Sequence, residues 1–449
     1  MTRTEPTQTP RRLLIMSRYP EPGRTKTRLI LGIGAEAAAL VHRELIKQVR
    51  DRVFPLADSQ EIQIEVHYEG GDAAQWYDLL GHTPCLIPQN GHSLGERIVN
   101  AMHSAFADGA SRVVVLGTDC PEIDSNIIRQ AFADLEFHDV VIGPALDGGY
   151  YLIGVRVPSA CIFQEIDWGT DSVLKQTLLK CRQHGLTVKQ LVPLADVDHP
   201  EDLLICRQHP DLCSQILPQT TLGLVSIIIP TLNEERQLAR TLSPLLGNRN
   251  VELIVVDAGS NDRTTEIAQE LGARVIQTQP GRGRQMNAGA ALARGEVLLF
   301  LHADSLLPAE YFSEIWSILF QGGIAGAFSL KIESELAGIR WIEWGANIRS
   351  RYRQLPYGDQ GLFLRAADFY QMRGFKYWPL MEDYEFCRRL KQRGRILISS
   401  AGILTSGRRW ESLGVMKTTL MNQLCINAYR GGVSPESIAR FYRRPIQNH

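Results

Sequence analysis

Acidic and imidazole side chains follow three short apolar runs in the second half of the sequence. The runs 225–229, 253–256 and 297–301 consist mostly of Val, Ile and Leu, which is typical of buried parallel strands. The residues that follow them include Pro230 and Glu234, then Asp257, then His302 and Asp304. Parallel strands bring their carboxyl ends to one rim of a sheet, where open α/β sheets bind ligands. An acidic rim holds a diphosphate only through a cation, so we expect Mg²⁺ or Mn²⁺ there.

Each of these positions also has a plainer interpretation. A single aspartate such as Asp257 is typical of a turn or a helix N-cap. Arg282, Arg284, Gln285 and Asn287 precede a run of small residues, and they indicate either base and phosphate contacts at a helix N-terminus or a basic loop capped by Asn287. The adjacent acids Glu382 and Asp383 suit a helix N-terminus as well as a reaction.

The first half carries a second set of candidate residues. A strand pattern at RRLLIMSR leads into a loop that contains Arg24, Lys26 and Arg28, which favours phosphate binding or, alternatively, a solvated basic turn. Asp119 follows the apolar run VVVLGT, Asp147 lies in ALDGGYY, and Asp198 lies in DVDHPEDL. At a sheet rim these carboxylates would hold a metal-bound nucleotide, whereas turn aspartates and a plain hairpin are the alternatives.

The predicted strands and helices of the two halves fit two separate domains. A chain of 449 residues, 44% hydrophobic and 22% charged, has the composition of soluble globular proteins. The sequence predicts an α/β protein with two tandem domains, each a mainly parallel sheet flanked by helices: residues 11–206, a linker over 207–222, and residues 223–449. A net charge of −1 argues against general nucleic-acid binding. We expect no signal peptide, no transmembrane segment and a cytoplasmic protein, since no window approaches eighteen apolar residues.

The first domain resembles a known family through PEPGRTKTRL, QNGHSLGERI, GTDCPEI, ALDGGYYLIG and DVDHPEDL. It is similar to an uncharacterised bacterial transferase family with a GT-A-like fold, related to nucleotidyltransferases. The resemblance implies a site at Arg24, Lys26, Arg28, Asp119, Asp147 and Asp198. The chain lacks the Gly-rich opening loop of true nucleotidyltransferases, which puts NTP condensation in question.

The second domain resembles inverting family 2 glycosyltransferases through SIIIPTLNEE, VVDAGSNDRT, GRGRQMNAGAALARGEVLLFLHADS, GDQGLFLRAADF and MEDYEFCRRLKQRGR. The resemblance implies that Pro230, Glu234 and Asp257 hold the nucleotide. It places metal and diphosphate at the DxD position, which here reads His302-Ala303-Asp304. It makes Asp383 of the Glu382-Asp383 pair the general base, and Arg284 and Asn287 donor contacts. Histidine in place of the first DxD aspartate leaves Asp304 as the firmer metal ligand.

Two further segments bear on the acceptor. Trp341, Trp344 and Tyr357 lie among arginines, a pattern that favours a core face, a sugar or lipid contact, or a helix resting on a membrane surface. Arg408, Arg409 and Trp410 stand in SGRRWES where processive relatives carry QxxRW, but Ser406 replaces the glutamine.

We therefore expect a metal-dependent glycosyltransferase that uses a nucleotide sugar and a small or lipid-like hydroxyl or carboxyl acceptor, with possible peripheral contact at the inner membrane face. The alternatives make the first domain a nucleotidyltransferase or a degenerate binding module. Fusions of these two families resemble enzymes associated with arsenosugar biosynthesis.

Overall fold

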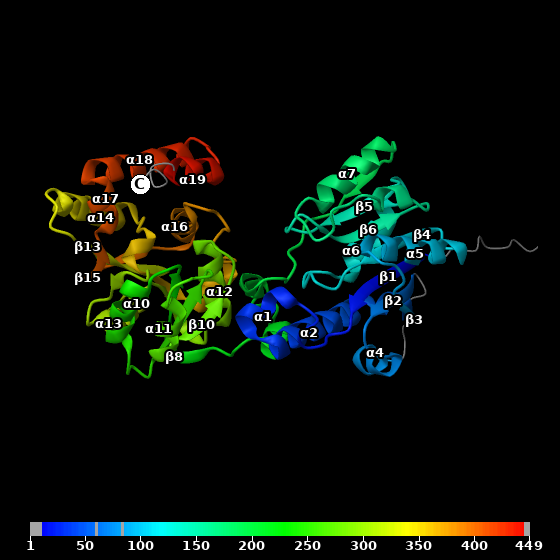
Figure 1. The fold of residues 1–449 in the computed structure, drawn as a ribbon, viewed down its shortest axis with the longest axis horizontal. Helices are drawn as coiled ribbons and strands as arrows, with labels where there is room; N and C mark the ends of the chain where they lie inside the picture. The colour runs from blue at the N-terminus through cyan, green and yellow to red at the C-terminus, as the bar shows by residue number, and fades with distance from the viewer. Residues whose placement is uncertain (1–10, 59–61, 82–84, 444–449) are drawn as a thin grey trace, which may run out of the picture. The chain divides into compact units, whose positions relative to one another are not determined.

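The structure is a computed structural model that describes residues 11–58, 62–81 and 85–443. The chain divides into two compact units, Met1–Asp198 and His199–His449, which are described separately (Figure 1). The expected fold class is confirmed in each unit, because both contain a mainly parallel sheet flanked by helices.

The first unit is built on a seven-stranded sheet of order β3-β2-β1-β4-β6-β5-β7. Its strands are β1 (Arg11–Arg18), β2 (Gln63–Glu69), β3 (Cys85–Pro88), β4 (Arg112–Leu116), β5 (Val140–Pro144), β6 (Tyr150–Val155) and β7 (Val188–Gln190). The sheet is parallel from β3 to β4, and β6 runs antiparallel to both β4 and β5. Alternate residues of β1 serve opposite faces: Leu13 and Ile15 join one buried cluster and Leu14 joins another.

Helices cover both faces of this sheet. The longest is α2, whose apolar residues Leu45, Ile46 and Val49 are buried. The helices are α1 (Thr27–Ile33), α2 (Ala35–Val53), α3 (Pro55–Asp58), α4 (Ala73–Leu80), α5 (Leu94–Ala107), α6 (Ser125–Asp134) and α7 (Val173–Gln183), with a 3₁₀ turn η1 (Ala160–Phe163). Aspartate and serine N-caps start α4, α5 and α6 at Asp72, Ser93 and Asp124.

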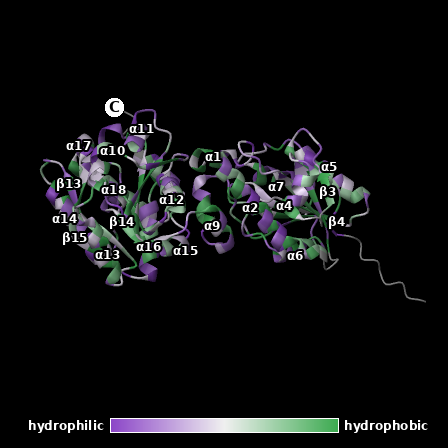
Figure 2. Ribbon diagram, turned by 90° about the horizontal axis from the view of Figure 1, so that it is seen from below, coloured by the Kyte–Doolittle hydropathy of each residue, from purple (hydrophilic) through white to green (hydrophobic). Residues whose placement is uncertain are grey.

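The second unit is built on an eight-stranded sheet of order β10-β9-β8-β11-β14-β13-β15-β12. Its strands are β8 (Thr221–Thr231), β9 (Val251–Asp257), β10 (Arg274–Gln277), β11 (Gly295–Phe300), β12 (Ser305–Leu306), β13 (Ala325–Glu333), β14 (Leu362–Arg365) and β15 (Ile396–Ser406). Three of these are the apolar runs from which the strands were predicted. Hydrophobic residues colour the strands green in both units (Figure 2).

The two sheets share one topology. When strands are ranked along their own unit and β12 is left aside, both sheets read 3-2-1-4-6-5-7. The pairing sense also agrees: the sixth strand is antiparallel to the fourth and the fifth, and the seventh is parallel to the fifth. The ends of β4 and β11 are therefore equivalent places, and they precede Asp119 and Asp304.

Helices flank the second sheet and cover its carboxyl rim. They are α10 (Glu235–Leu242), α11 (Thr264–Glu270), α12 (Arg282–Leu292), α13 (Tyr311–Phe320), α14 (Ile339–Arg353), α15 (Ala366–Gln371), α16 (Glu382–Arg393), α17 (Arg408–Leu413), α18 (Val415–Arg430) and α19 (Pro435–Arg443), with 3₁₀ turns η3 (Ser243–Leu245) and η4 (Gly358–Gln360). Helix α12 is buried on nearly all sides, which its Gly and Ala residues permit. Within the part of the chain that the structure describes, no helix is long and apolar enough to cross a membrane.

The segment that leads into β8 is folded against the second unit. It forms a 3₁₀ turn η2 (Pro200–Asp202), α8 (Leu203–Cys206) and α9 (Pro210–Ile216). Arg207 donates to the carbonyls of Ala291 and Ala293 at the end of α12, at 2.8 to 3.0 Å. The compact unit thus begins at His199, earlier than the predicted boundary at residue 206 and the predicted linker over 207–222. The reason is that this polar, proline-bearing segment packs on α12, where Arg207 donates hydrogen bonds to the carbonyl groups at the end of the helix.

Candidate active site of the second unit

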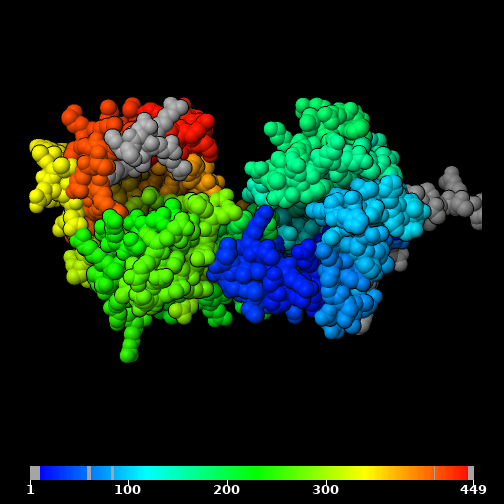
Figure 3. Space-filling view, in the orientation of Figure 1, coloured from blue at the N-terminus to red at the C-terminus, as the bar shows by residue number. Residues whose placement is uncertain are grey.

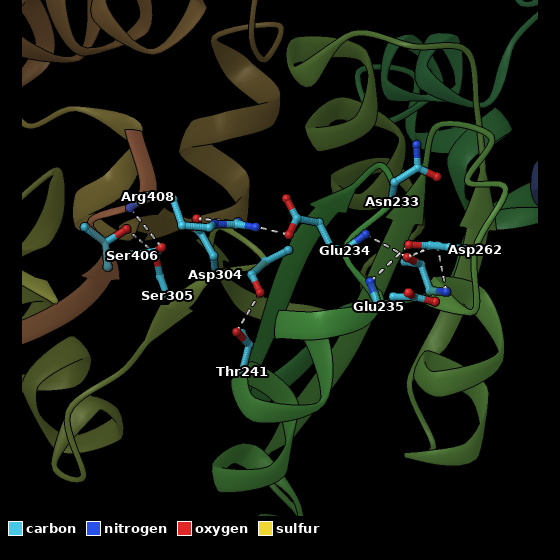
Figure 4. Close-up of polar contacts among 12 residues, drawn as sticks. Asn233, Glu234, Glu235, Thr241, Asp262, Asp304, Ser305, Ser406 and Arg408 are labelled. Carbon is cyan, nitrogen blue, oxygen red and sulfur yellow. Dashed lines mark hydrogen bonds and ion pairs between the residues drawn. The ribbon is translucent and has the colours of Figure 1, made fainter. Parts of the chain in front are cut away.

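The carboxylates of Glu234 and Asp304 converge on one guanidinium at the rim of the second sheet. Nη2 of Arg408 lies 3.1 Å from Oε2 of Glu234 and 3.0 Å from Oδ2 of Asp304 (Figure 4). Burial raises the pKa of Glu234, and Arg408 opposes that rise. Two acids that follow separate strands thus face one point, as the strand-end pattern predicted.

Backbone pairing positions these three residues. Glu234 is the N-cap residue of α10, and its N–H donates to Thr264. Thr241 donates to the carbonyl of Ala303, which fixes the loop that carries Asp304 (Figure 4). Ser305 in β12 pairs with Thr405 in β15, so Arg408, which follows β15, is brought beside Asp304.

A divalent cation fits this corner only with ligands from outside the protein. Within residues 11–58, 62–81 and 85–443, no group of three or more His, Cys, Asp or Glu side chains forms a metal cage. Glu234 and Asp304 are hard oxygen ligands of the kind that Mg²⁺ and Mn²⁺ prefer. Such an ion would take its remaining ligands from a diphosphate and water, as Mg²⁺ commonly does in phosphate sites.

His302 lies apart from the Arg408 ion pairs. Its Nε2 would come within 3.0 Å of a methyl group placed on Gly358, so the imidazole lies against the turn beside Asp383. Burial lowers the pKa of His302 to about 3, with a further contribution from Arg282, and Nε2 is buried without a hydrogen-bond partner among the described residues. Whether this neutral ring ligates a metal stays a prediction.

The carboxylate of Asp257 accepts hydrogen bonds from the turn that follows it. Its Oδ2 accepts from the backbone N–H groups of Gly259 and Ser260, both at 2.9 Å, and its Oδ1 accepts from the Ser260 hydroxyl. The residue is 1% exposed. This is the turn-aspartate geometry that the sequence left open, and nucleotide binding by Asp257 stays a prediction.

Arg284 and Asn287 hold parts of the fold together. Arg284 forms an ion pair at 2.8 Å with the fully buried Glu201 and stacks over Tyr377. Asn287, 1% exposed, donates to the carbonyl of Phe375 and accepts from its N–H, both at 2.9 Å. Both side chains are therefore occupied within the protein, and their contact with a nucleotide remains a prediction.

The adjacent acids Glu382 and Asp383 open α16 and differ in environment. Oδ2 of Asp383 accepts from the Gly358 N–H at 2.7 Å, and Oδ1 accepts from the Tyr384 N–H at 2.6 Å. Glu382 is buried, 4.0 Å from Arg282. Burial and the charge of Asp383 raise the pKa of Glu382 to about 7. Asp383 is thus an oriented carboxylate, and the neighbouring Glu382 keeps its proton up to about pH 7.

Asp304 and Asp383 line the same cavity, which has a volume of about 270 Å³. Figure 3 shows the second unit hollowed below the red C-terminal helices. The walls also include Tyr357, Tyr384 and Trp410, and α18 contributes Asn422, Cys425 and Ile426. Pro230 lies next to this space, in a small void that His302, Gly358 and Asp383 also line.

In the first unit, a lysine occupies the position between two carboxylates. Nζ of Lys26 lies 2.5 Å from Asp119 and 2.9 Å from Asp198, and Arg28 lies 3.3 Å from Asp198. Burial lowers the pKa of Lys26, but both carboxylates raise it and the net shift is upward. Burial and the charge of Asp147 raise the pKa of Asp196 to about 7.

The structure thus brings Lys26, Arg28, Asp119 and Asp198 into direct contact, with Asp147 close enough to Asp196 to affect its charge. Arg24 instead pairs with exposed Glu21 at 3.2 Å. The role of all six predicted residues in ligand binding stays a prediction.

Two segments match known families. Residues 53–170 match a family described as an uncharacterized protein conserved in bacteria (DUF2064). Residues 226–372 match the family described as Glycosyl transferase family 2. Residues 226–372 of the second unit are thus similar in sequence to family 2 glycosyltransferases.

The curated relatives match over part of their length. A glucosyl-3-phosphoglycerate synthase of Mycolicibacterium smegmatis is 35% identical over 100 residues, which cover 20% of this chain and 33% of that protein. A 4,4'-diaponeurosporenoate glycosyltransferase of Staphylococcus haemolyticus is 38% identical over 96 residues, or 19% of this chain and 26% of that protein. The chain thus spans about a quarter to a third of the length of these relatives.

Two solved structures are similar to parts of the chain. A structure described as a "putative nucleotide-diphospho-sugar transferase" from Desulfovibrio desulfuricans G20 is 33% identical, covers 46% of this chain and 99% of its own, and has a TM-score of 0.42. Glucosyl-3-phosphoglycerate synthase from Mycobacterium tuberculosis, in complex with Mn²⁺, UDP and glucosyl-3-phosphoglycerate, is 18% identical, covers 52% of this chain and 85% of its own, and has a TM-score of 0.36.

Sequence reasoning missed the position of Arg408. The signal was present, because SGRRWES was recognised as a variant of a known pattern, but its link to Glu234 and Asp304 spans 174 and 104 residues. Trp410 was likewise noticed without a role, and it lines the cavity.

Proposed function

We propose that the second unit transfers a sugar from a nucleotide-sugar donor to a hydroxyl acceptor, with a divalent metal and with inversion. The observation that carries the proposal is one cavity lined by both Asp304, at the acidic strand-end corner, and Asp383, a carboxylate oriented by two backbone N–H groups. The family 2 match over residues 226–372 supports it.

In this mechanism Asp383 removes the proton from the acceptor hydroxyl as the oxygen attacks the anomeric carbon. The N–H groups of Gly358 and Tyr384 aim its oxygens. Glu234 and Asp304 would hold the metal in place of Arg408, and the metal would neutralise charge on the departing diphosphate. A single in-line displacement inverts the anomeric configuration.

The test uses two substitutions that keep the shape of the site. Asp383→Asn and Asp304→Asn should each reduce metal-dependent release of UDP or GDP from a nucleotide sugar by at least ~100-fold, the usual scale for a general base or an electrostatic contact. Asp211→Asn is the matched control, since Asp211 is exposed on α9. Full turnover in both site variants would refute the proposal.

The identity of the acceptor is a finer question. The names of the relatives include a phosphoglycerate and a carotenoid acid, and the sequence resemblance adds arsenosugar precursors and lipids. The exposed Trp341 and Trp344 on α14, 74% and 61% accessible, suit a membrane-surface contact. Binding to anionic vesicles that is lost in Trp341→Ser/Trp344→Ser would support that contact, and unchanged binding would exclude it.

A second candidate function concerns the first unit. Lys26, Arg28, Asp119 and Asp198 meet at the strand-end position equivalent to that of Asp304. We propose that they bind a phosphorylated compound, either as a nucleotidyltransferase or as a non-catalytic module. Pyrophosphate release from an NTP that Asp119→Asn abolishes would favour catalysis, whereas unchanged turnover in that variant would favour the binding module.

A further inference from the structure

The cavity beside Asp383 contains three buried polar atoms that lack hydrogen-bond partners among the described residues. They are Nε2 of His302, Oδ1 of Asp359 and Nε1 of Trp410, and all three residues line the cavity. They come from separate places in the fold: the loop after β11, the turn η4 and the helix α17. A buried polar atom without a hydrogen-bond partner destabilises the protein. Three such atoms on one cavity indicate a ligand that supplies several hydrogen bonds.

The charges around the cavity disfavour an anion. The described residues that line it include four carboxyl groups, Asp304, Asp359, Glu382 and Asp383, against one guanidinium, that of Arg282. Burial raises the pKa of Asp359 to about 6, and burial with the charge of Asp383 raises that of Glu382 to about 7. Ionisation of Asp359 and Glu382 is therefore already less favourable inside this cavity than in water.

Two neighbouring arginines contribute little charge to this cavity. Arg408 pairs with Glu234 and Asp304 and is not among the described residues that line the cavity. Arg349 stacks over Tyr357 at 3.5 Å from the ring centroid and donates to the carbonyl of Leu355. An incoming phosphate or carboxylate would meet the carboxyl groups of Asp359, Glu382 and Asp383. Among the described lining residues only the guanidinium of Arg282, 4.0 Å from Glu382, could pair with it. This excess of negative charge is unfavourable in a desolvated site.

The size of the cavity restricts the acceptor further. Its volume of about 270 Å³ is close to the lower end of the ~300–1,000 Å³ range typical of small-molecule sites, which suits a compact acceptor. Tyr357, Tyr384 and Trp410 provide ring faces of the kind on which sugars and polyols pack. The Trp410 N–H can donate to a hydroxyl, and the free oxygen of Asp359 can exchange a hydrogen bond with another.

We propose that the acceptor bound in this cavity is a compact compound with several hydroxyl groups, such as a polyol or a single sugar unit, and with no phosphate or carboxylate. This inference rests on the proposed glycosyltransferase function and specifies its acceptor class. One hydroxyl lies at Asp383 as the nucleophile, and the others satisfy Trp410, Asp359 and His302. The acceptor class therefore differs from the acids named for the curated relatives.

The experiment compares matched acceptor pairs with the full chain, Mn²⁺, and UDP-glucose or GDP-mannose as donor probes. The pairs are glucose with glucose 6-phosphate, glucose with glucuronate, and glycerol with glycerate. The uncharged member should give kcat/KM at least ~10-fold higher, which is the factor that about 1.4 kcal/mol produces. Equal or better use of the anionic members would overturn the inference. So would a lack of transfer to any uncharged compound while donor hydrolysis proceeds.

Two variants test the wall residues directly. Trp410→Phe keeps an aromatic face, although a smaller one, and removes the N–H, so it should raise KM for the uncharged acceptor ~10-fold and leave KM for the donor unchanged. Trp344→Phe is the control on exposed α14. Asp359→Asn should narrow the preference for glucose over glucose 6-phosphate several-fold, because it removes a negative charge without changing the shape. An unchanged preference and an unchanged acceptor KM would overturn the inference.

Donor hydrolysis separates this inference from the proposed function. Metal-dependent release of nucleoside diphosphate that is lost in Asp304→Asn would establish donor turnover regardless of the acceptor. If that release occurs and the acceptor preferences fail, the acceptor class is wrong and the function stands. If no donor is bound or hydrolysed, the glycosyltransferase function itself fails.

Discussion

Asp383 is oriented by the backbone, and burial of Glu382 beside it sets the pH at which a second negative charge appears there. The N–H groups of Gly358 and Tyr384 hold both Asp383 oxygens. Glu382 has a pKa raised to about 7 by burial and by the charge of Asp383. When Glu382 ionises, it adds a second negative charge beside Asp383.

The first prediction concerns Glu382→Gln and the pH profile. In the unchanged protein the rate should rise as pH increases through about 7, because Glu382 loses its proton there. The variant should lack that limb and show a rate lowered ~10-fold above pH 8, within the usual scale of acid and base effects. The measurement is kcat/KM for nucleoside diphosphate release from pH 5.5 to 9. An identical limb in the variant would show that another group titrates there.

The second prediction concerns Lys26→Met in the first unit. The substitution leaves Asp119 and Asp198 facing each other without the ammonium group that lies 2.5 and 2.9 Å from them. The free energy of unfolding should fall by ~1–3 kcal/mol, less than for a fully buried pair because both carboxylates are partly exposed.

Urea unfolding at pH 7.5 measures the effect of Lys26→Met. The double variant Lys26→Met/Asp119→Asn should recover part of the loss, because one repelling charge is gone. Arg24→Met, at a residue whose partner Glu21 is exposed, is the control. A double variant less stable than the single one would contradict the explanation.

At the level of single residues, the sequence identified those that follow a strand. Asp304, Asp119 and Glu234 each lie a few positions beyond an apolar run, so their place at a rim could be predicted from order alone. Arg408 could not be placed, since nothing local shows that β12 and β15 pair at Ser305 and Thr405. The contact of Asn287 with Phe375 could not be predicted either, because Phe375 lies 88 residues away.

At the level of elements, α12 connects the rim to the loop that precedes α16. Asn287 makes two hydrogen bonds with the backbone of Phe375. The adjacent Gly374 has φ +61, and a methyl group there would come within 2.5 Å of Oδ1 of Asn287. The conformation of this loop therefore depends on a close approach that glycine permits.

The third prediction is that Asn287→Ala acts on folding. It removes two buried hydrogen bonds and leaves a backbone N–H and a carbonyl without partners, so the free energy of unfolding should fall by ~2–4 kcal/mol. Donor affinity per folded molecule should stay within twofold. Chemical denaturation and donor titration measure the two quantities, with exposed Gln269→Ala on α11 as the control. A large loss of donor affinity with unchanged stability would restore the predicted nucleotide role.

The elements themselves were more predictable than their contacts. The apolar runs became β8, β9 and β11, and the Glu382-Asp383 pair does begin a helix that ends at Arg393. The segment before β8 was read as a linker because it is polar and carries proline. Its contacts are with residues distant in the sequence. Arg207 donates to the carbonyl of Ala291, 84 residues away, and Glu201 pairs with Arg284, 83 residues away.

At the scale of the whole molecule, the division after Asp198 gives the fourth prediction. A chain that begins at His199 keeps the pairs of Glu201 with Arg284 and of Arg207 with the end of α12. A chain that begins at Thr220 loses both and leaves the carbonyls of Ala291 and Ala293 without those donors. The longer chain should unfold at a temperature several degrees higher, since ~2 kcal/mol shifts the midpoint by roughly 4–8 °C in a unit of this size.

Differential scanning calorimetry of the two truncated chains measures this difference. A chain that begins at Gln208, which lacks the ion pair of Glu201 and the contacts of Arg207 but keeps α9, is the control and should resemble the shorter chain. Equal midpoints for the chains that begin at His199 and Thr220 would show that residues 199–219 add nothing to the second unit.

The common strand order of the two sheets bears on how the polypeptide reaches its native state. Each unit contains strands of the same rank and pairing sense, so a strand of one sheet has a counterpart position in the other. Misassembly between such positions is a characteristic failure of chains with repeated architecture. Synthesis from the N-terminus limits it, because β1 to β7 are all made before β8. Refolding from denaturant removes that order. The yield of native chain should then depend on how quickly each sheet forms its own strand pairs.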